Sequence, residues 1–164
     1  MLKNGFCSFC GTAFAPEQAW PRQCANCGNI TYLNPLPVAV GLIPVGEGLL
    51  LIRRTVEPRV GSLALPGGFI NTGETWQEAC VREIEEETGI KIPAEEVLLY
   101  DALTALDGYV LIFGIVPPRD ADSLPSFTPN SETSEFLVAQ GPVEIGFPLH
   151  AQVVARYFRE QSPG

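Results

Sequence analysis

The sequence lacks any long hydrophobic run. Its apolar stretches fall far short of the roughly 20 residues that a membrane-spanning helix needs, and Met1-Leu2-Lys3 leads into no hydrophobic segment typical of a secretory signal. Internal repeats and low-complexity tracts are also missing. These absences argue against a membrane protein and a repeat array, and they predict a soluble protein in the cytoplasm.

Positive charge is scarce. The chain has 10 Lys and Arg against 19 Asp and Glu, which gives a formal charge of −9. Lys3 and Arg22 against Glu17 give residues 1–33 a charge of +1, so the remaining residues carry −10. Because Lys and Arg supply most of the non-specific affinity for a phosphate backbone, this balance argues against binding to duplex nucleic acid.

Histidine is nearly absent, and the composition is otherwise that of a folded chain. The single histidine, His150, begins the last predicted helix, where a helix-surface or capping role is expected ahead of catalysis. With 46% hydrophobic and 18% charged residues, the chain can bury a core. A length of 164 residues suits one ordinary domain with a small appendage.

The cysteines are concentrated at the N-terminus. Four of the five lie in two C-x-x-C-G motifs, at Cys7, Cys10, Cys24 and Cys27. Two such motifs supply four thiolates, which suits tetrahedral zinc, and four thiolates leave no position for water. Two disulfides in a secreted module are the alternative, which the missing signal segment disfavours. We therefore predict a structural zinc ribbon over residues 1–33, followed by a main domain over residues 34–164.

The main domain alternates strand and helix signals. Asn34-Pro35-Leu36-Pro37 marks its start, because proline favours an extended connector. A capping box at Thr75 and Glu78 begins a helix that ends at Gly89. A long loop at 117–130 is a candidate substrate loop or a variable surface loop. The predicted strands span 38–43, 49–53, 60–65, 98–103, 109–116 and 135–139, and a second helix spans 148–160.

The first helix carries unusual charge at its end. A helix C-terminus already has a partial negative charge, yet residues 83–87 hold four glutamates. At about 100° per residue, Glu83, Glu86 and Glu87 share one edge, while Glu85 points to solvent. A cation such as Mg²⁺ or Mn²⁺ would offset this charge. A solvated acidic face is the alternative.

The stretch from Gly68 to Ile90 resembles the Nudix box, G-x5-E-x7-R-E-U-x-E-E-x-G-U, where U is aliphatic. All nine defined positions match, and they are Gly68, Glu74, Arg82, Glu83, Ile84, Glu86, Glu87, Gly89 and Ile90. The four-cysteine ribbon is similar to that of the NADH pyrophosphatase branch of this family. The resemblance implies an α/β/α sandwich around a mixed sheet, and hydrolysis of a nucleoside diphosphate linked to another group.

The resemblance also implies roles for particular residues. Glu83, Glu86, Glu87 and the Gly68 carbonyl would bind Mg²⁺ or Mn²⁺, with Glu83 and Glu87 also catalytic. Glu74 and Arg82 would organise the box, with Arg82 ion-paired inside it. In the late segment SETSEFLVA, Glu135 is the first candidate for a further catalytic glutamate and Glu132 is the second. Either is alternatively ordinary surface charge.

Substrate contacts are less well marked. Arg53, Arg54 and Phe69 could contact phosphate or a base, although solvent exposure or packing is the commoner fate of such residues. Cys80 lies on the apolar face of the helix and is expected in the core. The SQPWPFPxS motif of NADH pyrophosphatases is absent, since YDALTALDGYVLIFG stands there instead.

Three functions follow from these observations. The first is a pyrophosphohydrolase acting on a small nucleotide of dinucleotide type, such as NADH, FAD or ADP-ribose. A nucleotide-binding regulator of the same fold and a zinc-ribbon nucleic-acid adaptor are the alternatives. No membrane partner is expected, and the sequence leaves open a homodimer.

Overall fold

The chain divides into two compact units, Met1–Pro35 and Leu36–Gly164. The computed structural model describes residues 4–161. In the described residues, no helix is both long and apolar enough to cross a membrane.

The N-terminal unit consists of two similar cysteine turns and one short hairpin. Strands β1 (Arg22–Gln23) and β2 (Ile30–Thr31) pair antiparallel. In each turn, the glycine after the second cysteine has a left-handed backbone, with φ of 74° at Gly11 and 73° at Gly28. Their N–H groups donate to the carbonyls of Cys7 and Cys24, both at 2.9 Å. Glycine is required because other residues rarely adopt this φ, so the two sequence motifs become two equivalent turns.

The second unit contains two sheets. One has the strand order β7-β3-β9-β8, in which β3 and β9 pair in parallel and the other pairs are antiparallel. The other has the order β10-β5-β4, with β6 also paired to β5, and all of its pairs are antiparallel. The strands are β3 (Leu36–Leu42), β4 (Pro44–Val45), β5 (Gly48–Arg54), β6 (Leu63–Ala64), β7 (Gly67–Phe69), β8 (Leu98–Ala105), β9 (Tyr109–Ile115) and β10 (Thr133–Ala139).

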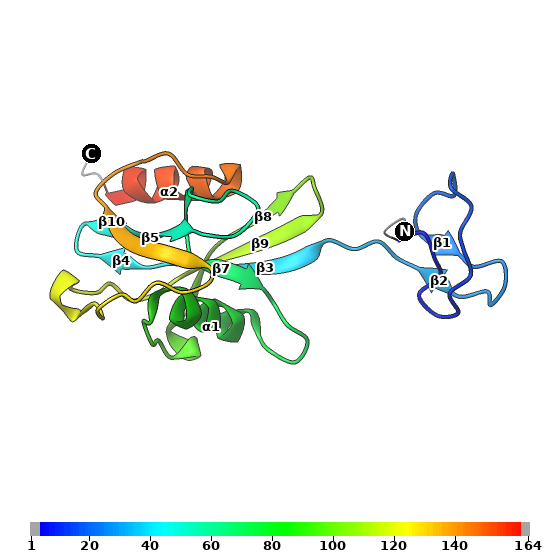
Figure 1. Ribbon diagram of the computed structural model, residues 1–164, viewed down its shortest axis with the longest axis horizontal. Helices are drawn as coiled ribbons and strands as arrows, with labels where there is room; N and C mark the ends of the chain where they lie inside the picture. The colour runs from blue at the N-terminus through cyan, green and yellow to red at the C-terminus, as the bar shows by residue number, and fades with distance from the viewer. Residues whose placement is uncertain (1–3, 162–164) are drawn as a thin grey trace. The chain divides into compact units, whose positions relative to one another are not determined.

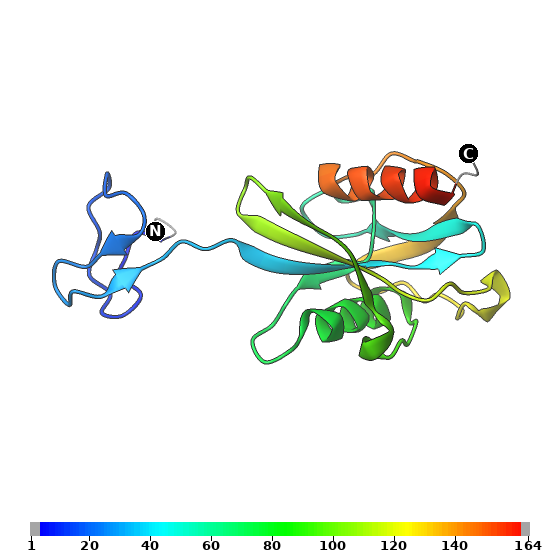
Figure 2. The same cartoon turned by 180° about the vertical axis from the view of Figure 1, so that it is seen from behind.

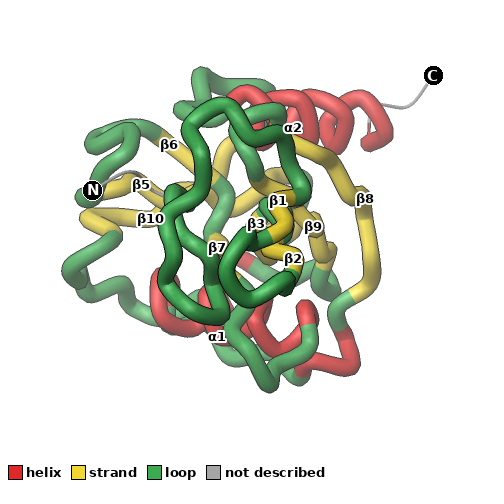
Figure 3. The backbone as a smooth tube through the Cα atoms, turned by 90° about the vertical axis from the view of Figure 1, so that its right-hand side faces the viewer, coloured by secondary structure: helices red, strands yellow, loops and turns green. Residues whose placement is uncertain are grey.

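Two helices enclose these strands. Helix α1 (Trp76–Thr88) lies on one side and α2 (Pro148–Gln161) lies on the opposite side (Figure 1), and the view from behind shows the same layers (Figure 2). The end-on view in Figure 3 shows the strands of this unit between α1 and α2. Two short 3₁₀ segments, Ala94–Glu96 and Ala121–Ser123, lie in the connections. The predicted α/β/α sandwich with a mixed sheet is confirmed.

Strand β5 explains why the core has two halves. Successive side chains of a strand point to opposite faces. Leu50 and Ile52 therefore pack in the cluster that contains Ile84 of α1, whereas Leu49 and Leu51 pack in the cluster that contains Val153 of α2. A strand buried on both faces must be apolar at every position, which accounts for the uninterrupted sequence Leu49-Leu50-Leu51-Ile52.

Paired glycines let α1 approach the sheet closely. Gly41 of β3 and Gly114 of β9 are partners in the parallel ladder. A Cβ atom added at Gly41 would lie 2.5 Å from Ile84 Cδ1, and one at Gly114 would lie 3.3 Å from Cys80 Sγ. Cys80 is buried, as expected for a core residue. The glycine pair therefore sets the height of α1 above the sheet.

The predicted boundaries of α1 are confirmed, and α2 begins where predicted and ends one residue later, at Gln161. The side chain and backbone of Thr75 form the capping box with Glu78, and Gly89 ends α1 with φ of 76°. The predicted strand at 60–65 is reduced to the two residues of β6. The expected surface position of His150 is wrong, because its side chain is buried and its Nδ1 accepts a hydrogen bond from Leu65 N at 3.3 Å. Its packing between Phe113 and Phe147 explains the burial.

Candidate active site and zinc site

The three glutamates at the end of α1 differ in burial. Glu83 is 9% exposed and Glu87 is 2% exposed, whereas the side chain of Glu86 is 59% exposed. Glu85 points to solvent, as predicted, and pairs with Lys91 at 3.2 Å. Glu83 and Glu87 therefore face the sheet together, and Glu86 lies at the outer margin of their edge.

Strand β7 makes room for the two buried carboxylates because it begins with two glycines. Gly67 N donates to Glu87 Oε2 at 2.8 Å. Any Cβ atom at Gly68 would collide with the carboxylate of Glu83. Gly68 therefore lies in contact with Glu83, and a side chain at position 68 would displace the Glu83 carboxylate.

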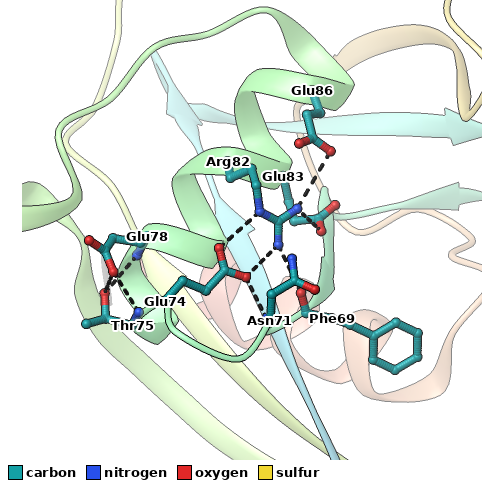
Figure 4. A network of polar contacts seen from close by, with 8 residues as sticks. All are labelled: Phe69, Asn71, Glu74, Thr75, Glu78, Arg82, Glu83 and Glu86. Atoms are coloured by element: carbon teal, nitrogen blue, oxygen red, sulfur yellow. Dashed lines mark hydrogen bonds and ion pairs between the residues drawn. The ribbon is translucent and has the colours of Figure 1, made fainter.

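Arg82 joins the loop before α1 to the helix itself (Figure 4). Its Nη2 lies 2.8 Å from Glu74 Oε1, and its Nη1 lies 2.6 Å from Glu83 Oε1 and 3.6 Å from Glu86 Oε2. Nη2 also donates to the carbonyl of Phe69 at 3.0 Å. The hydrogen bonds from Arg82 and from the backbone of Asn71 lower the pKa of Glu74 to about 2. The structure thus contains the ion pairs that the sequence predicts for Arg82.

Two acidic side chains, Glu83 and Glu87, are shielded from solvent, so their charged forms are disfavoured. Burial raises the pKa of Glu87 to about 8, and the charges of Glu83 and Glu132 act in the same direction. Burial also raises the pKa of Glu83, against the hydrogen bond and charge of Arg82. In residues 4–161, no Lys or Arg nitrogen lies within 4.0 Å of the Glu87 carboxylate. A buried carboxylate without a cationic partner is costly, so this arrangement favours a bound cation.

The donor atoms suit a hard divalent cation, because Mg²⁺ and Mn²⁺ prefer carboxylate and carbonyl oxygens. In this structure Arg82 Nη1 contacts both Glu83 and Glu86. A cation that used both glutamates would share them with Arg82 or displace its contacts. Among the described residues, only the four cysteines converge closely enough to form a ready metal cluster.

The two late glutamates have different surroundings. Glu135 lies opposite Arg53 in the β10–β5 ladder, and its Oε1 accepts a hydrogen bond from Arg53 Nε at 2.6 Å. Glu132 lies in the preceding loop, and its charge acts on both Glu83 and Glu87. Through Asn130, which bonds both the Glu86 carbonyl and the Glu132 N–H, the structure links the backbone of Glu132, the second candidate from the sequence, to the end of α1. It pairs Glu135 with an arginine.

The three expected substrate contacts lie at the end of β5, for Arg53 and Arg54, and at the end of β7, for Phe69. The charge of Arg54 lowers the pKa of Glu87, although burial dominates there, and its guanidinium lies 5.3 Å from the ring centre of Phe147. Arg53 also donates to the carbonyl of Gly61. Phe69 is 52% exposed, and its ring centre lies 6.0 Å from that of Tyr109. Sequence reasoning missed Tyr109, because only the pairing of β3 with both β7 and β9 brings it beside Phe69.

The four N-terminal cysteines converge on one point. The Sγ atoms of Cys7 and Cys27 lie 3.7 Å apart, those of Cys10 and Cys24 lie 3.6 Å apart, and all four lie within 4.8 Å of one another. Zn–S bonds of about 2.3 Å in a tetrahedron place sulfurs about 3.8 Å apart. All four cysteines are free, so the disulfide alternative is wrong. The cluster fits a structural zinc ion.

Comparisons with known proteins divide the chain in the same way. A model described as the NUDIX domain matches residues 35–141, and one described as the NADH pyrophosphatase zinc ribbon domain matches residues 2–32. The chain is 50% identical over 68 residues to an ADP-ribose pyrophosphatase of Methanocaldococcus jannaschii. The aligned residues make up 42% of this chain and 40% of that protein. It is also 34% identical over 88 residues to the NAD-capped RNA hydrolase NudC of Salmonella typhi. Those residues make up 53% of this chain and 34% of that protein.

The chain thus spans less than half the length of these two curated relatives. A solved NUDIX hydrolase from Nitrosomonas europaea matches with a TM-score of 0.73 at 24% identity, covering 94% of this chain and 90% of that one. A bifunctional NMN adenylyltransferase/ADP ribose pyrophosphatase from Francisella tularensis matches with a TM-score of 0.63 at 20% identity, covering 80% and 42%. At these identities the structures support the fold alone.

Proposed function

The chain belongs to the Nudix hydrolase family, and from that membership we propose that it is a pyrophosphohydrolase dependent on Mg²⁺ or Mn²⁺. Its substrate is a nucleoside diphosphate linked to a second group. Water attacks one phosphorus of the diphosphate, the bond from that phosphorus to the bridging oxygen breaks, and two phosphate-bearing products leave.

The observation that carries this proposal is the buried pair of Glu83 and Glu87 beside the glycines of β7. These carboxylates are desolvated, and Glu87 has no cationic side chain in contact among the described residues. The glycines keep side chains away from them. Such an edge can accept a cation and a polyphosphate together. Buried acidic side chains without a cationic partner lower the stability of the fold, so stability alone does not account for them.

Glu83, Glu86, Glu87 and the carbonyl of Gly68 hold the cation in this proposal. When bound, the cation supplies positive charge that offsets the charge developing on the diphosphate oxygens. Arg82 and Glu74 keep Glu83 in place through their ion pairs. Glu83 or Glu132 accepts the proton of the attacking water. Glu135, the first candidate from the sequence, instead holds Arg53 beside the substrate.

We propose ADP-ribose as the first substrate to test, ahead of NADH and FAD. The relative with 50% identity is an ADP-ribose pyrophosphatase, and the chain lacks the downstream motif of NADH pyrophosphatases. In this proposal Arg54, whose charge acts on Glu87, contacts a phosphate, and exposed Phe69 contacts a base or sugar.

A product screen tests this function. The full chain is incubated with Mg²⁺ or Mn²⁺ and a panel containing ADP-ribose, NADH, FAD, dinucleoside polyphosphates and nucleoside triphosphates, and the products are identified by mass spectrometry. We expect AMP and ribose 5-phosphate from ADP-ribose, only when a divalent cation is present. Binding of panel members without any product would contradict the proposal and indicate a nucleotide-binding regulator.

A further inference from the structure

Asn130 makes an unusual set of contacts for an exposed side chain. It lies at the end of the loop between β9 and β10, three residues before β10 begins. Its Nδ2 donates to the backbone carbonyl of Glu86 at 2.8 Å. Its Oδ1 accepts hydrogen bonds from the backbone N–H groups of Glu132 at 2.9 Å and Thr133 at 2.8 Å. One amide group therefore connects the last turn of α1 to the backbone that carries Glu132.

The helix end needs such a partner. The last four carbonyls of a helix have no intrahelical donor, and Glu86 is in this group because α1 ends at Thr88. The Glu85 carbonyl receives the Gly89 N–H instead. Asn130 thus satisfies a carbonyl in the same turn that presents Glu83, Glu86 and Glu87.

A second group holds the same short segment from the opposite side. Thr55, which follows β5, donates its N–H to the carbonyl of Glu132 at 2.8 Å and its hydroxyl to the carbonyl of Ser131 at 2.6 Å. Residues 131–132 are therefore tied to β5 through Thr55 and to α1 through Asn130. Of these two connections, the one through Asn130 is the direct link between the Glu132 backbone and the helix that carries Glu83, Glu86 and Glu87.

We propose that Asn130 is a positioning residue that fixes Glu132 against the buried glutamates of α1 for hydrolysis. This inference rests on the proposed function, and it adds a residue outside the box that the reaction requires. Catalysis is sensitive to such placement, because a displacement of about 1 Å can lower a rate by about 100-fold. The fold is much less sensitive, because an exposed hydrogen bond contributes little net stability.

The test is a double-mutant cycle on the full chain with Mg²⁺ and ADP-ribose, comparing Asn130→Ala, Glu132→Gln and the double variant. If Asn130 acts through Glu132, Asn130→Ala should lower kcat by about tenfold or more, with KM changed by less than about twofold. In the Glu132→Gln background the same change should have almost no further effect. Ser134→Ala is the matched control, because it removes one hydrogen bond from this segment to β5 and none to α1. Its kcat should equal that of the wild type.

Asn130→Asp is a second variant that keeps the inference testable if the alanine variant fails to fold. It has the same size and keeps the oxygen that accepts from Glu132 and Thr133, but it cannot donate to the Glu86 carbonyl, so kcat should fall in the same way. Equal loss from Asn130→Ala in both backgrounds, or unchanged kcat in both Asn130 variants, would overturn the inference. A wild-type chain that cleaves no diphosphate would instead overturn the proposed function.

Discussion

At the scale of single residues, Glu87 is the clearest case in which the proposed metal site and the stability of the fold favour different side chains. Its carboxylate is 2% exposed and contacts a backbone N–H but no cationic side chain among the described residues. Burial of an uncompensated charge is destabilising. We infer that this residue is retained for chemistry at a cost in stability.

Glu87→Gln should therefore have opposite effects on activity and stability. We expect kcat to fall by at least about 100-fold, because the amide cannot offset a cation. At neutral pH and without a divalent cation, the thermal midpoint should rise by a few degrees. Burial raises the pKa of Glu87 to about 8, so folding must protonate an acid that is ionised in the unfolded chain, and glutamine removes that cost. Steady-state kinetics and calorimetry on the same preparation measure both quantities.

Glu85→Gln is the matched control for this change, because Glu85 lies two residues away in the same helix and faces solvent. It should leave kcat within about twofold. If Glu85→Gln were as damaging as Glu87→Gln, the assignment of the two faces of α1 would be wrong.

The limits of sequence reasoning are also clearest at this scale. Helical angles predicted that Glu83, Glu86 and Glu87 share an edge. Only Glu83 and Glu87 contact the glycines of β7, however, and Glu86 is exposed. The choice between Glu132 and Glu135 depended on the β5–β10 pairing, which opposes Arg53 and Glu135 across 82 positions. A register shift between Thr133 and Glu135 changes the pairing there. Local sequence carries no sign of either feature.

At the scale of elements, α1 is the best predicted part of the chain. Its first and last residues follow from capping residues close by in the sequence, which are Thr75 and Glu78 at the start and Gly89 at the end. The parallel pairing of β3 with β9 could not be read in the same way, because the two strands are far apart in sequence. The height of α1 above the sheet depends on that pairing through Gly41 and Gly114.

Gly41→Ala should therefore destabilise the second unit and impair the site. The added methyl would lie 2.5 Å from Ile84 Cδ1 and 2.8 Å from Ile84 Cγ1, so the Ile84 side chain or α1 itself must shift. We expect a loss of about 1–3 kcal/mol in the free energy of unfolding, measured by urea denaturation, together with a lower kcat.

Gly141→Ala provides the comparison for this prediction. A Cβ atom there would have no neighbour within 4 Å, and its φ is not in the left-handed region. Its free energy of unfolding should change by less than about 0.5 kcal/mol. Equal destabilisation by both variants would show that the close approach of α1 does not limit stability.

At the scale of the whole molecule, we propose that residues 1–33 and 34–164 are separate domains with separate metals. Among its described residues, the N-terminal unit has only a small apolar cluster, which contains Phe14 and two of the cysteines. A unit this small rarely folds without a metal or cross-links, whereas zinc binding can supply roughly 10 kcal/mol or more. The second unit has two large core clusters of its own.

Zinc removal should therefore affect the two units differently. We expect one zinc per chain by elemental analysis, and its loss in Cys10→Ser. The N-terminal unit should then become sensitive to protease while Mg²⁺-dependent hydrolysis persists in the rest of the chain. Cys80→Ala should retain zinc, because Cys80 is a residue of α1 that is buried in the core of the second unit. Protein purified without chelators that contained no zinc would contradict the assignment.

The central claim is that water attacks phosphorus at the edge formed by α1 and β7, and isotope labelling tests it most directly. ADP-ribose is hydrolysed by the full chain with Mg²⁺ in ¹⁸O-water, and the products are analysed by mass spectrometry. We predict AMP and ribose 5-phosphate with one heavy oxygen on the phosphate of one product, which identifies the attacked phosphorus. Release of free adenine, or a heavy oxygen on a ribose carbon, would show cleavage at the sugar and contradict the account.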